Sequence, residues 1–326
     1  MLNGKKILFI TPAYFDYPEI IRSGLEEQGA EVDLIYCSPT DAINKIISVL
    51  SDLLLKKYEK RYFRIQKKRI KKSYDFILII RADLIPEDFI KFLRVRNPVS
   101  FFIQYLWDDI GMFPSITDSF NYFDRILSYN IHDSKEFGLK FRPFFFIPDD
   151  VGMKEKRKQY DLFFIGIFHT DRVEVIEKVK RLNPGVNFYL HFYINLLTFL
   201  KAGIPFKYLK LFRLRKMNYK EMIGIVKRSS AVLDIPKPTQ RGLSTRVIEA
   251  LGAGVKVITT NVNVKEYEFY NCNNFLIIDR EKPLIEKEWM PLPYKVYDEG
   301  LVNRYHISNW IGDVFNSDIN INMVQY

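Results

Sequence analysis

The stretch QRGLSTRVIEALGAGVKVITTN, from Gln240 to Asn261, places small, basic and acidic residues in an order that suits the binding of an anion. Ser244 or Thr245 can cap a helix whose apolar residues fall on one face. The first turn of such a helix points unpaired N–H groups and the positive end of its dipole at whatever lies before it. Arg241 and Arg246 bracket that turn, and guanidinium groups bind phosphate oxygens through paired hydrogen bonds. The segment predicts a phosphate site, although an ordinary helix start with solvated arginines would leave the same local pattern.

Glu249 follows on the first or second turn of the same helix. Its carboxylate is placed to accept hydrogen bonds from sugar hydroxyls, as acidic residues do with ribose in other nucleotide sites. Gly252 and Gly254 can end the helix, and the β-branched run from Val255 to Ile258 is typical of a strand buried in a parallel sheet. We therefore expect a loop, a short helix and a buried strand.

This segment resembles the donor-binding motif in the C-terminal domain of GT-B glycosyltransferases. In that motif a small-residue loop opens a helix that carries a glutamate, and an Ala-x-Gly turn and a strand follow. Many retaining members also carry a first glutamate eight residues earlier, but this position is Arg241 here. The resemblance implies an α/β protein with two Rossmann-like domains facing across a cleft. It also implies donor binding by Arg241, Gly242, Ser244, Thr245 and Glu249, without the first acid of the retaining pattern.

Strands and helices alternate in the first half of the chain, which predicts a parallel sheet with helices on both faces. The predicted strands are Lys5–Ile10, Val32–Tyr36, Phe76–Ile80, Val99–Tyr105, Arg125–Tyr129 and Pro143–Ile147. The predicted helical stretches between them include one that ends near Gly29, Asp41–Lys72 and Pro86–Arg96.

Ligands of such sheets collect at the carboxyl ends of the strands. Asp16 follows the first predicted strand, and Asp108 follows the fourth in the sequence YLWDD. Since the first glutamate is missing, we expect an inverting transfer, in which a carboxylate of the N-terminal domain takes the proton from the acceptor hydroxyl. Asp16 is the first candidate for this base and Asp108 the second. Acidic residues in such loops are more often helix caps or solvated turns.

The second half restarts with a predicted strand, Tyr160–Gly166, and the turn FIGIFHTDR sets Gly166, His169 and Arg172 before the next helix. In GT-B enzymes the matching loop often supplies a basic residue to the donor diphosphate, and Arg172 is the best match to that role. A loop histidine without a ligand is the simpler interpretation of His169. The other predicted strands are Asn187–His191, Ala231–Ile235 and Phe275–Ile278, and the other predicted helices are Asp171–Leu182, Tyr193–Lys216, Tyr219–Arg228, Val264–Tyr270 and Asn303–Phe315.

With 326 residues the chain is longer than most single cores, so we expect two domains, residues 1–150 and 151–302. The stretch from 148 to 159 is rich in proline, glycine and charge and is the predicted linker. Residues 303–326 include apolar residues at helical spacing, and the resemblance implies a helix that crosses back to the N-terminal domain.

The net charge of +10 favours anionic partners, among them nucleotide-sugars, anionic lipid surfaces and nucleic acids. Two cysteines, Cys37 and Cys272, provide neither a disulfide framework nor a cysteine metal site, which fits a reducing cytosol. The opening apolar run is too short for a signal peptide, and no stretch of about 18–20 apolar residues is available to span a bilayer. We expect a cytoplasmic protein, attached peripherally to the inner face of the plasma membrane.

The sequence from Leu53 to Lys72, LLLKKYEKRYFRIQKKRIKK, carries ten basic residues and one acid, with apolar residues interleaved. This composition is typical of a helix on an anionic bilayer. The expected membrane contacts are Lys67, Lys68, Arg69, Lys71 and Lys72. A solvated or partner-binding face and a nucleic-acid surface are the alternatives, and no motif of a known nucleic-acid module supports the last.

The resemblance implies a hexosyltransferase-type enzyme that moves a sugar from a nucleotide diphosphate sugar, such as a UDP-sugar, to a glycan or lipid-linked glycan. Bacterial enzymes of capsule and lipopolysaccharide synthesis are the most similar in layout. No cofactor and no metal are expected, because the helix dipole and the arginines can neutralise the leaving diphosphate. A nucleotide-sugar epimerase of the same fold is one alternative. A non-catalytic GT-B-like scaffold that binds nucleotide or membrane is another, and the missing glutamate favours it.

Overall fold

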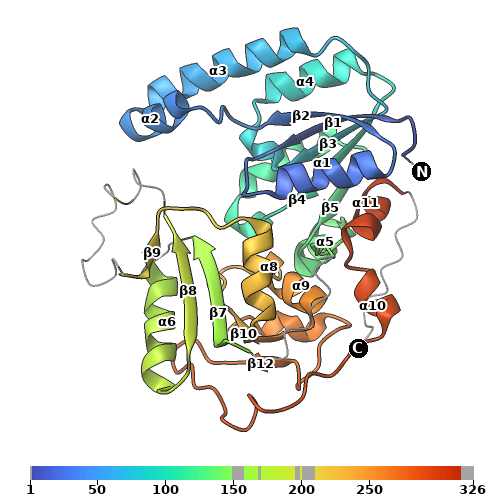
Figure 1. Cartoon of the computed structure of the whole chain (residues 1–326). Helices are drawn as coiled ribbons and strands as arrows, with labels where there is room; N and C mark the ends of the chain where they lie inside the picture. The colour runs from blue at the N-terminus through green and yellow to red at the C-terminus, as the bar shows by residue number, and fades with distance from the viewer. Residues whose placement is uncertain (1, 149–157, 168–169, 195–198, 200–209, 317–326) are drawn as a thin grey trace. The chain divides into compact units, whose positions relative to one another are not determined.

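The computed structural model of the chain describes residues 2–148, 158–167, 170–194, 199 and 210–316. Within these ranges the chain forms two compact units. The first unit comprises residues 2–143 and 307–316, and the second comprises 144–306. Each unit has its own six-stranded parallel sheet with helices packed on its faces (Figure 1), as the alternating strands and helices of the sequence predict.

The sheet of the first unit has the strand order β2-β1-β3-β4-β5-β6. Its strands are β1 (Lys6–Thr11), β2 (Glu31–Tyr36), β3 (Phe76–Ile80), β4 (Phe101–Leu106), β5 (Arg125–Ser128) and β6 (Lys140–Phe141). The strand predicted over Pro143–Ile147 is wrong, because the last strand ends at Phe141 and Phe146 forms only an isolated bridge with His306. Pro143 has no N–H to donate to a neighbouring strand, so the ladder cannot continue through it.

The helices of the first unit are α1 (Tyr17–Glu27), α2 (Ala42–Leu50), α3 (Asp52–Arg69), α4 (Glu87–Arg96), α5 (Ile131–Phe137) and α11 (Ile307–Phe315), with short 3₁₀ helices at Ala82–Leu84, Ile110–Met112 and Pro114–Tyr122. The single helical stretch predicted over Asp41–Lys72 is therefore divided into α2 and α3. Ser51 lies between them with an extended backbone, and its hydroxyl accepts a hydrogen bond from the Leu54 N–H at 3.4 Å. Serine is favoured at this capping position, which explains the break.

The last helix, α11, packs on α1 of the first unit, as predicted for a C-terminal helix that crosses back. A Cβ atom at Gly24 of α1 would lie only 2.7 Å from Cδ1 of Ile311. The Trp310 ring is fully buried, with its centroid 4.9 Å from that of Tyr105 in β4. The helix predicted over Asn303–Phe315 is α11, which begins later, at Ile307, and a turn separates it from α10 (Glu299–Asn303) of the second unit.

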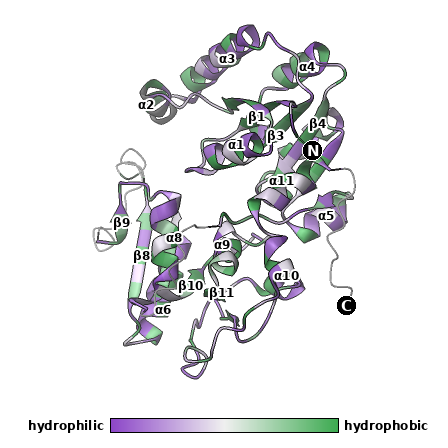
Figure 2. Cartoon of the chain, turned by 45° about the vertical axis from the view of Figure 1, so that its right-hand side comes forward, coloured by the Kyte–Doolittle hydropathy of each residue, from purple (hydrophilic) through white to green (hydrophobic). Residues whose placement is uncertain are grey.

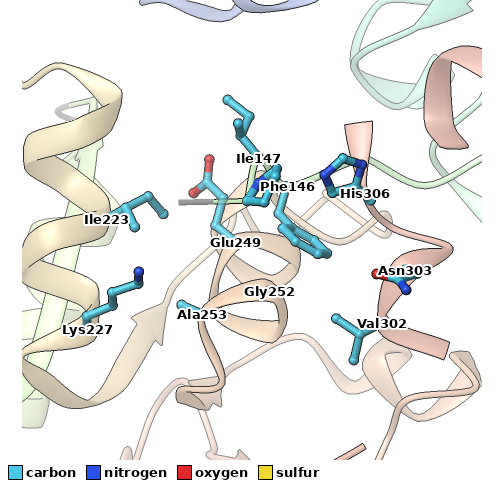
Figure 3. Close-up of a pocket in the computed structure, with 11 residues that line it drawn as sticks. Phe146, Ile147, Ile223, Lys227, Glu249, Gly252, Ala253, Val302, Asn303 and His306 are labelled. Carbon is cyan, nitrogen blue, oxygen red and sulfur yellow. The ribbon is translucent and has the colours of Figure 1, made fainter. Parts of the chain in front are cut away.

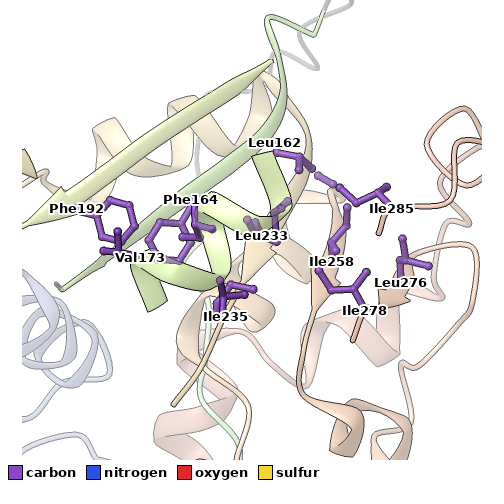
Figure 4. Close-up of a cluster of buried hydrophobic side chains, with 14 of the residues drawn as sticks. Leu162, Phe164, Val173, Phe192, Leu233, Ile235, Ile258, Leu276, Ile278 and Ile285 are labelled. Carbon is purple, nitrogen blue, oxygen red and sulfur yellow. The ribbon is translucent and has the colours of Figure 1, made fainter. Parts of the chain in front are cut away.

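The sheet of the second unit has the order β12-β11-β10-β7-β8-β9. Its strands are β7 (Tyr160–Ile167), β8 (Phe188–Tyr193), β9 (Phe212–Arg213), β10 (Ser229–Asp234), β11 (Lys256–Thr259) and β12 (Phe275–Ile277), and its other helices are α6 (Thr170–Leu182), α8 (Tyr219–Lys227) and α9 (Thr245–Ala253). Apolar residues of α6 and of the central strands form one buried cluster that includes Phe164, Leu233 and Ile258 (Figure 4).

Two predictions in this unit need correction. The helix predicted over Tyr193–Lys216 lies largely outside the described residues, but Phe212–Arg213 form β9, which pairs with β8. Phe212 is buried with its ring near Phe192, so pairing at the sheet edge outweighs local helical periodicity. The helix predicted near Val264–Tyr270 is a short 3₁₀ helix, Val262–Glu266.

Candidate functional site

The order of the second sheet determines where a ligand of this unit is expected. From β7 the chain adds β8 and β9 on one side, and β10 then pairs with the other side of β7. The connections therefore reverse direction between β7 and β10. In open parallel sheets such a reversal leaves a crevice beyond the carboxyl ends of the two strands, and ligands bind there.

The side chain of Arg172, in α6, lies at this switch point and bonds to the backbone at the ends of both strands. Its Nε donates to the carbonyl of Ile235, just beyond β10, at 2.7 Å, and its Nη1 donates to the carbonyl of Ile167, the last residue of β7, at 3.0 Å. The side chain is buried. Two of the five N–H donors of this guanidinium thus link the end of β7 to the residue after β10. The structure gives Arg172 a role in holding the strand ends, in addition to any contact with phosphate.

Gly166 is the residue of β7 that lets Arg172 approach. A Cβ atom at this position would lie 3.1 Å from Nη1 of Arg172 and 2.9 Å from Cζ of Phe164. Any larger side chain would displace the guanidinium or the ring. His169, the other residue predicted in this loop, lies outside the described residues.

Asp234, the last residue of β10, is a fully buried acceptor for three side chains. Its Oδ1 accepts from the Ser244 hydroxyl at 2.7 Å and from Nη2 of Arg246 at 2.8 Å, and its Oδ2 accepts from the Thr259 hydroxyl at 2.9 Å. Ser244 is the residue before α9, but its hydroxyl binds Asp234 and does not cap the helix. The start of α9 is consequently fixed to the sheet without a side-chain cap.

Three arginines from different parts of the sequence lie near the carboxyl ends of these strands. Arg246 also donates from Nη1 to the carbonyl of Ile165 in β7 at 3.0 Å. Arg280, three residues beyond β12, donates to the carbonyl of Pro236 at 3.0 Å and pairs with Asp171. Burial, with the charges of Arg246 and Arg280, lowers the pKa of Arg172 to about 9. These arginines thus create a positive potential at the carboxyl ends of the strands, which an anion would relieve.

Asp234 and Arg280 are two residues of this site that the sequence motifs did not indicate. Asp234 lies at the carboxyl end of the predicted strand Ala231–Ile235, and Arg280 lies two residues beyond the predicted strand Phe275–Ile278. The carboxyl-end rule that selects Asp16 and Asp108 in the first half could therefore have identified both. Arg280 also has a buried Nε–H without a hydrogen-bond partner in the described part of the chain. An oxygen atom of a ligand would satisfy that donor.

The loop before α9 is held by its backbone. The Arg241 carbonyl accepts from the side-chain amides of Asn261 at 3.2 Å and Asn263 at 3.0 Å, and the Gly242 carbonyl accepts from Asn261 at 3.2 Å. The Arg241 side chain is exposed, and Thr245 is partly buried. The loop therefore has a fixed course while one of its cations faces solvent.

Glu249 lies apart from these groups, on the flank of α9. It lines a cavity of about 260 Å³ together with Ile223 and Lys227 of α8, Asn303 of α10 and His306 (Figure 3). Glu249 is almost completely buried. The volume is slightly below the roughly 300–1,000 Å³ typical of sites that enclose a whole drug-sized ligand, so a sugar ring or similar fragment fits best.

The first unit has its own polar cluster at the carboxyl ends of β1, β3 and β4. Arg81 follows β3 and is buried. It donates to both oxygens of Asp83 at 2.8 Å, to the Tyr14 hydroxyl at 3.2 Å and to Asp108. The Phe113 ring lies 3.9 Å from the guanidinium carbon. Arg81 therefore orients Asp108, one of the two predicted bases.

Backbone strain marks the same end of this sheet. Among the described residues, the non-glycine residues with positive φ are Phe15 at 45° and Arg81 at 62°. They lie in the loops after β1 and β3, where the sheet order reverses. Such conformations cost on the order of 1–3 kcal/mol and cluster at functional sites. Asp16, the other predicted base, directly follows Phe15 and precedes α1 without capping it by its side chain.

The environment of Asp108 changes its acidity. Burial raises the pKa of its carboxyl, Arg81 partly offsets this, and Asp83 and Asp109 raise it further. A carboxylate with a raised pKa accepts a proton more readily near neutral pH than an ordinary aspartate does. Asp16 is half-buried at the start of α1.

The predicted membrane contacts divide into two groups. Lys67 pairs with Asp88 at 2.6 Å, and Lys72 pairs with Glu31 and with Asp33, the latter at 3.1 Å. The charges of Lys67 and Lys72 are therefore paired with carboxylates of the first unit. The side chains of Lys68, Arg69 and Lys71 are exposed.

In the described ranges, no helix is both long and apolar enough to cross a membrane. The same ranges hold no group of three His, Cys, Asp or Glu side chains arranged to bind a metal ion.

No protein-family model matches this sequence, and the comparison with curated proteins found no match. Solved structures match over nearly the whole chain. The Anabaena protein Alr3699/HepE in complex with UDP and glucose is 10% identical with a TM-score of 0.59, and the alignment covers 95% of this chain and 98% of that one. The UDP-forming α,α-trehalose-phosphate synthase from Burkholderia xenovorans in complex with glucose-6-phosphate is 11% identical with a TM-score of 0.59, at 95% and 98% coverage. The Methanocaldococcus jannaschii UDP-GlcNAc 2-epimerase in complex with UDP-GlcNAc and UDP is 14% identical with a TM-score of 0.52, at 92% and 98% coverage. At these identities the comparisons establish the fold, and the prediction of a GT-B fold is confirmed.

Proposed function

We propose that this chain is a glycosyltransferase that takes its sugar from a nucleoside diphosphate sugar. The observation that supports this most directly is the convergence of Arg172, Arg246 and Arg280 at the carboxyl ends of β7, β10 and β12. Against Asp234 and Asp171 these arginines leave one net positive charge, which suits a diphosphate better than a neutral ligand. Proteins of this fold with UDP or UDP-sugars bound are among the matching structures.

In this proposal the diphosphate lies at the start of α9. The Ser244 hydroxyl bonds to Asp234, so an oxygen of the ligand takes the place of a side-chain cap for the first-turn N–H groups. Exposed Arg241 contributes a further cation from the loop before α9. The ribose reaches the cavity beside Glu249, whose carboxylate accepts bonds from its hydroxyls.

The chemistry we propose is inverting transfer. The acceptor oxygen attacks the anomeric carbon as the bond from that carbon to the diphosphate oxygen breaks, and the acceptor proton passes to a carboxylate of the first unit. Asp108 now has the stronger support for this role because Arg81 orients it and burial raises its pKa. Asp16 remains the second candidate. The nucleoside diphosphate leaves with its charge balanced by the arginines.

The proposed acceptor is a glycan or lipid-linked glycan of a cell-surface polysaccharide such as capsule or lipopolysaccharide. The basic surface of the first unit, with Lys68, Arg69 and Lys71 exposed, favours an acceptor presented at an anionic membrane.

The decisive experiment screens the purified chain against nucleoside diphosphate sugars for thermal stabilisation and then assays the best donor. A ligand at 100 times its Kd adds about 2.7 kcal/mol, which is easily seen in a melting curve. A transferase releases nucleoside diphosphate and moves the sugar to an acceptor, or to water slowly when no acceptor is present. Binding without any turnover of donor would favour a scaffold that binds nucleotide, and no binding at all would refute the proposed site.

An epimerase is the second candidate, since two UDP-GlcNAc 2-epimerases are among the matching structures. An epimerase changes the configuration of the donor sugar in the absence of an acceptor. Nuclear magnetic resonance of the donor during incubation distinguishes the two reactions, because epimerisation produces a new sugar nucleotide and transfer produces free nucleoside diphosphate.

A further inference from the structure

The surface of α2 and of the first turns of α3 exposes large apolar residues that contribute nothing to the core. Their exposed fractions are Ile43 56%, Ile46 52%, Leu50 72%, Leu53 65% and Leu54 50%. The three residues of α2 fall at i, i+3 and i+7, which places them on one helix face. Leu53 and Leu54 follow directly across the break at Ser51. Five large apolar side chains in a stretch of twelve residues therefore form one exposed patch.

The rest of α3 packs on the first unit and so holds this patch in place. Phe63 and Gln66 of α3 are buried, and the Phe63 ring packs 4.8 Å from that of Phe89 in α4. The Tyr62 hydroxyl donates to the carbonyl of Tyr36 at 2.9 Å, and the Tyr58 hydroxyl donates to Asp41, just before α2, at 2.9 Å. One face of α3 is thus fixed to the first unit, and its opposite face is presented to solvent.

That outer face continues the apolar patch with positive charge. Leu54, Arg61 and Ile65 lie at i, i+7 and i+11, so cations and apolar side chains share the face. The exposed cations of α3 are Lys56, Lys57, Lys60, Arg61, Arg64, Lys68 and Arg69. None of them forms an ion pair within the described part of the chain, in contrast to Lys67 and Lys72. Figure 2 shows the largely hydrophobic α2 next to the largely hydrophilic α3.

We propose that residues 43–64 form a docking surface for a lipid bilayer that carries anionic headgroups. Helices with an apolar face flanked by lysine and arginine lie in the interface of such bilayers, with the apolar side chains among the acyl chains and the cations among the headgroups. Charge complementarity selects this occupant: a nucleic acid would bind the cations but would leave the leucines and isoleucines exposed to water. The proposed contact thus extends the exposed cations at the end of α3, where Lys67 and Lys72 are paired within the first unit, to α2 and the start of α3.

The test is co-sedimentation of the full chain with vesicles of phosphatidylcholine alone or of phosphatidylcholine mixed with phosphatidylglycerol. We expect at least tenfold more binding to the mixed vesicles, and loss of most of this difference at high salt, because exposed charges are screened over roughly 8 Å already at physiological ionic strength. The variant Ile46→Ser/Leu50→Ser/Leu53→Ser and the variant Lys57→Glu/Lys60→Glu/Arg64→Glu should each bind at least tenfold less. Both should melt like the unchanged protein, because all six side chains are exposed.

Matched controls separate this surface from general attraction by a basic protein. Val95→Ser/Val99→Ser changes exposed apolar residues elsewhere in the first unit, and Arg181→Glu/Lys282→Glu/Lys287→Glu makes the same charge change in the second. Both controls should bind like the unchanged protein. Equal binding to the two kinds of vesicle, binding to neither, or an equal loss in the control variants would overturn the proposal. So would a concentration-dependent dimer that the Ile46→Ser/Leu50→Ser/Leu53→Ser variant abolishes, since a second copy would then be the occupant. Vesicle binding needs no nucleotide-sugar, so this test and the test of transfer can fail separately.

Discussion

Arg246 and Asp234 form an ion pair, with 2.8 Å between Nη2 and Oδ1, that ties the first turn of α9 to the carboxyl end of β10. Asp234 is fully buried, and the Arg246 side chain is 13% exposed. Removing one partner of a buried pair leaves the other charge without compensation. The pair therefore contributes to the fold of the second unit as well as to the position of the proposed phosphate site.

We expect Asp234→Ala to lower the free energy of unfolding by about 3–5 kcal/mol, because Arg246 would remain buried without its partner. Ser244→Ala removes only one of the hydrogen bonds to Asp234 and should cost about 1 kcal/mol. Urea denaturation of both variants measures the difference. Equal losses in the two variants would show that Asp234 is not the centre of this network.

Arg172 and Arg241 should differ in what they support. Arg172→Ala leaves the carbonyls of Ile235 and Ile167 without their donor, at a cost of about 1–3 kcal/mol each, so it should lower the melting temperature as well as donor affinity. Arg241→Ala changes an exposed side chain and should alter stability by less than about 0.5 kcal/mol. It should still weaken donor binding by about 1.5–3 kcal/mol. Calorimetric titration with the best nucleoside diphosphate measures the affinity of each variant, and melting curves measure its stability. Unchanged affinity in both variants would mean that the site lies elsewhere.

Glu249→Gln tests the proposed ribose contact without changing the size of the side chain. The unchanged protein should bind a nucleoside diphosphate about 1.5–3 kcal/mol more tightly than the 2′-deoxy form, since a carboxylate would accept the bond from the hydroxyl. In the Gln variant this preference should shrink, and the double-mutant cycle isolates the contact. If the preference is the same in both proteins, Glu249 does not meet the ribose.

Gly252→Ala should destabilise the second unit. A Cβ atom at Gly252 would lie 2.2 Å from the Phe146 ring, and overpacking of this kind costs about 1–3 kcal/mol. Gly224→Ala is the matched control, because Gly224 is also helical and nothing lies within 4 Å of an added Cβ atom. That change should stabilise by about 0.4–1 kcal/mol. Thermal unfolding of the Gly252→Ala and Gly224→Ala variants measures both effects. A Gly252→Ala variant as stable as the unchanged protein would mean that Phe146 is free to move away.

Asp108 should make both activity and stability depend on pH. If Asp108 is the base, the transfer rate falls as the pH drops through its raised pKa, at a higher pH than for an ordinary aspartate. The carboxyl has a higher pKa in the folded protein than its value of 3.8 in the unfolded chain. It therefore lowers the free energy of unfolding as the pH rises from 3.8 through the folded pKa. Asp108→Asn should therefore abolish transfer, and its stability relative to the unchanged protein should be greater at pH 7 than at pH 3. The same relative stability at both pH values would contradict the raised pKa.

The sequence alone determined the elements whose signals are local. The apolar run Phe76–Ile80 is a strand with the predicted bounds, and the helix predicted after Ser244 begins at Thr245 and ends before Gly254, which has the left-handed φ of 63° that glycine favours. Buried parallel strands need continuous apolar residues, and short helices need caps and stops, so both leave a pattern in the sequence. The repetition of these patterns predicted parallel sheets covered by helices, and the resemblance of the segment 240–261 to the donor-binding motif implied the GT-B fold.

The tertiary structure decided which of the polar residues act together. Arg280 and Asp171 form a pair although 109 positions separate them, and Lys67 is neutralised by Asp88 of another helix. These partners depend on the order of the strands and on which helix faces pack. Local periodicity reports which face of an element is buried but not which element covers it. For the same reason the sequence located a basic helix, and only the packing of α3 decided which of its cations remain exposed.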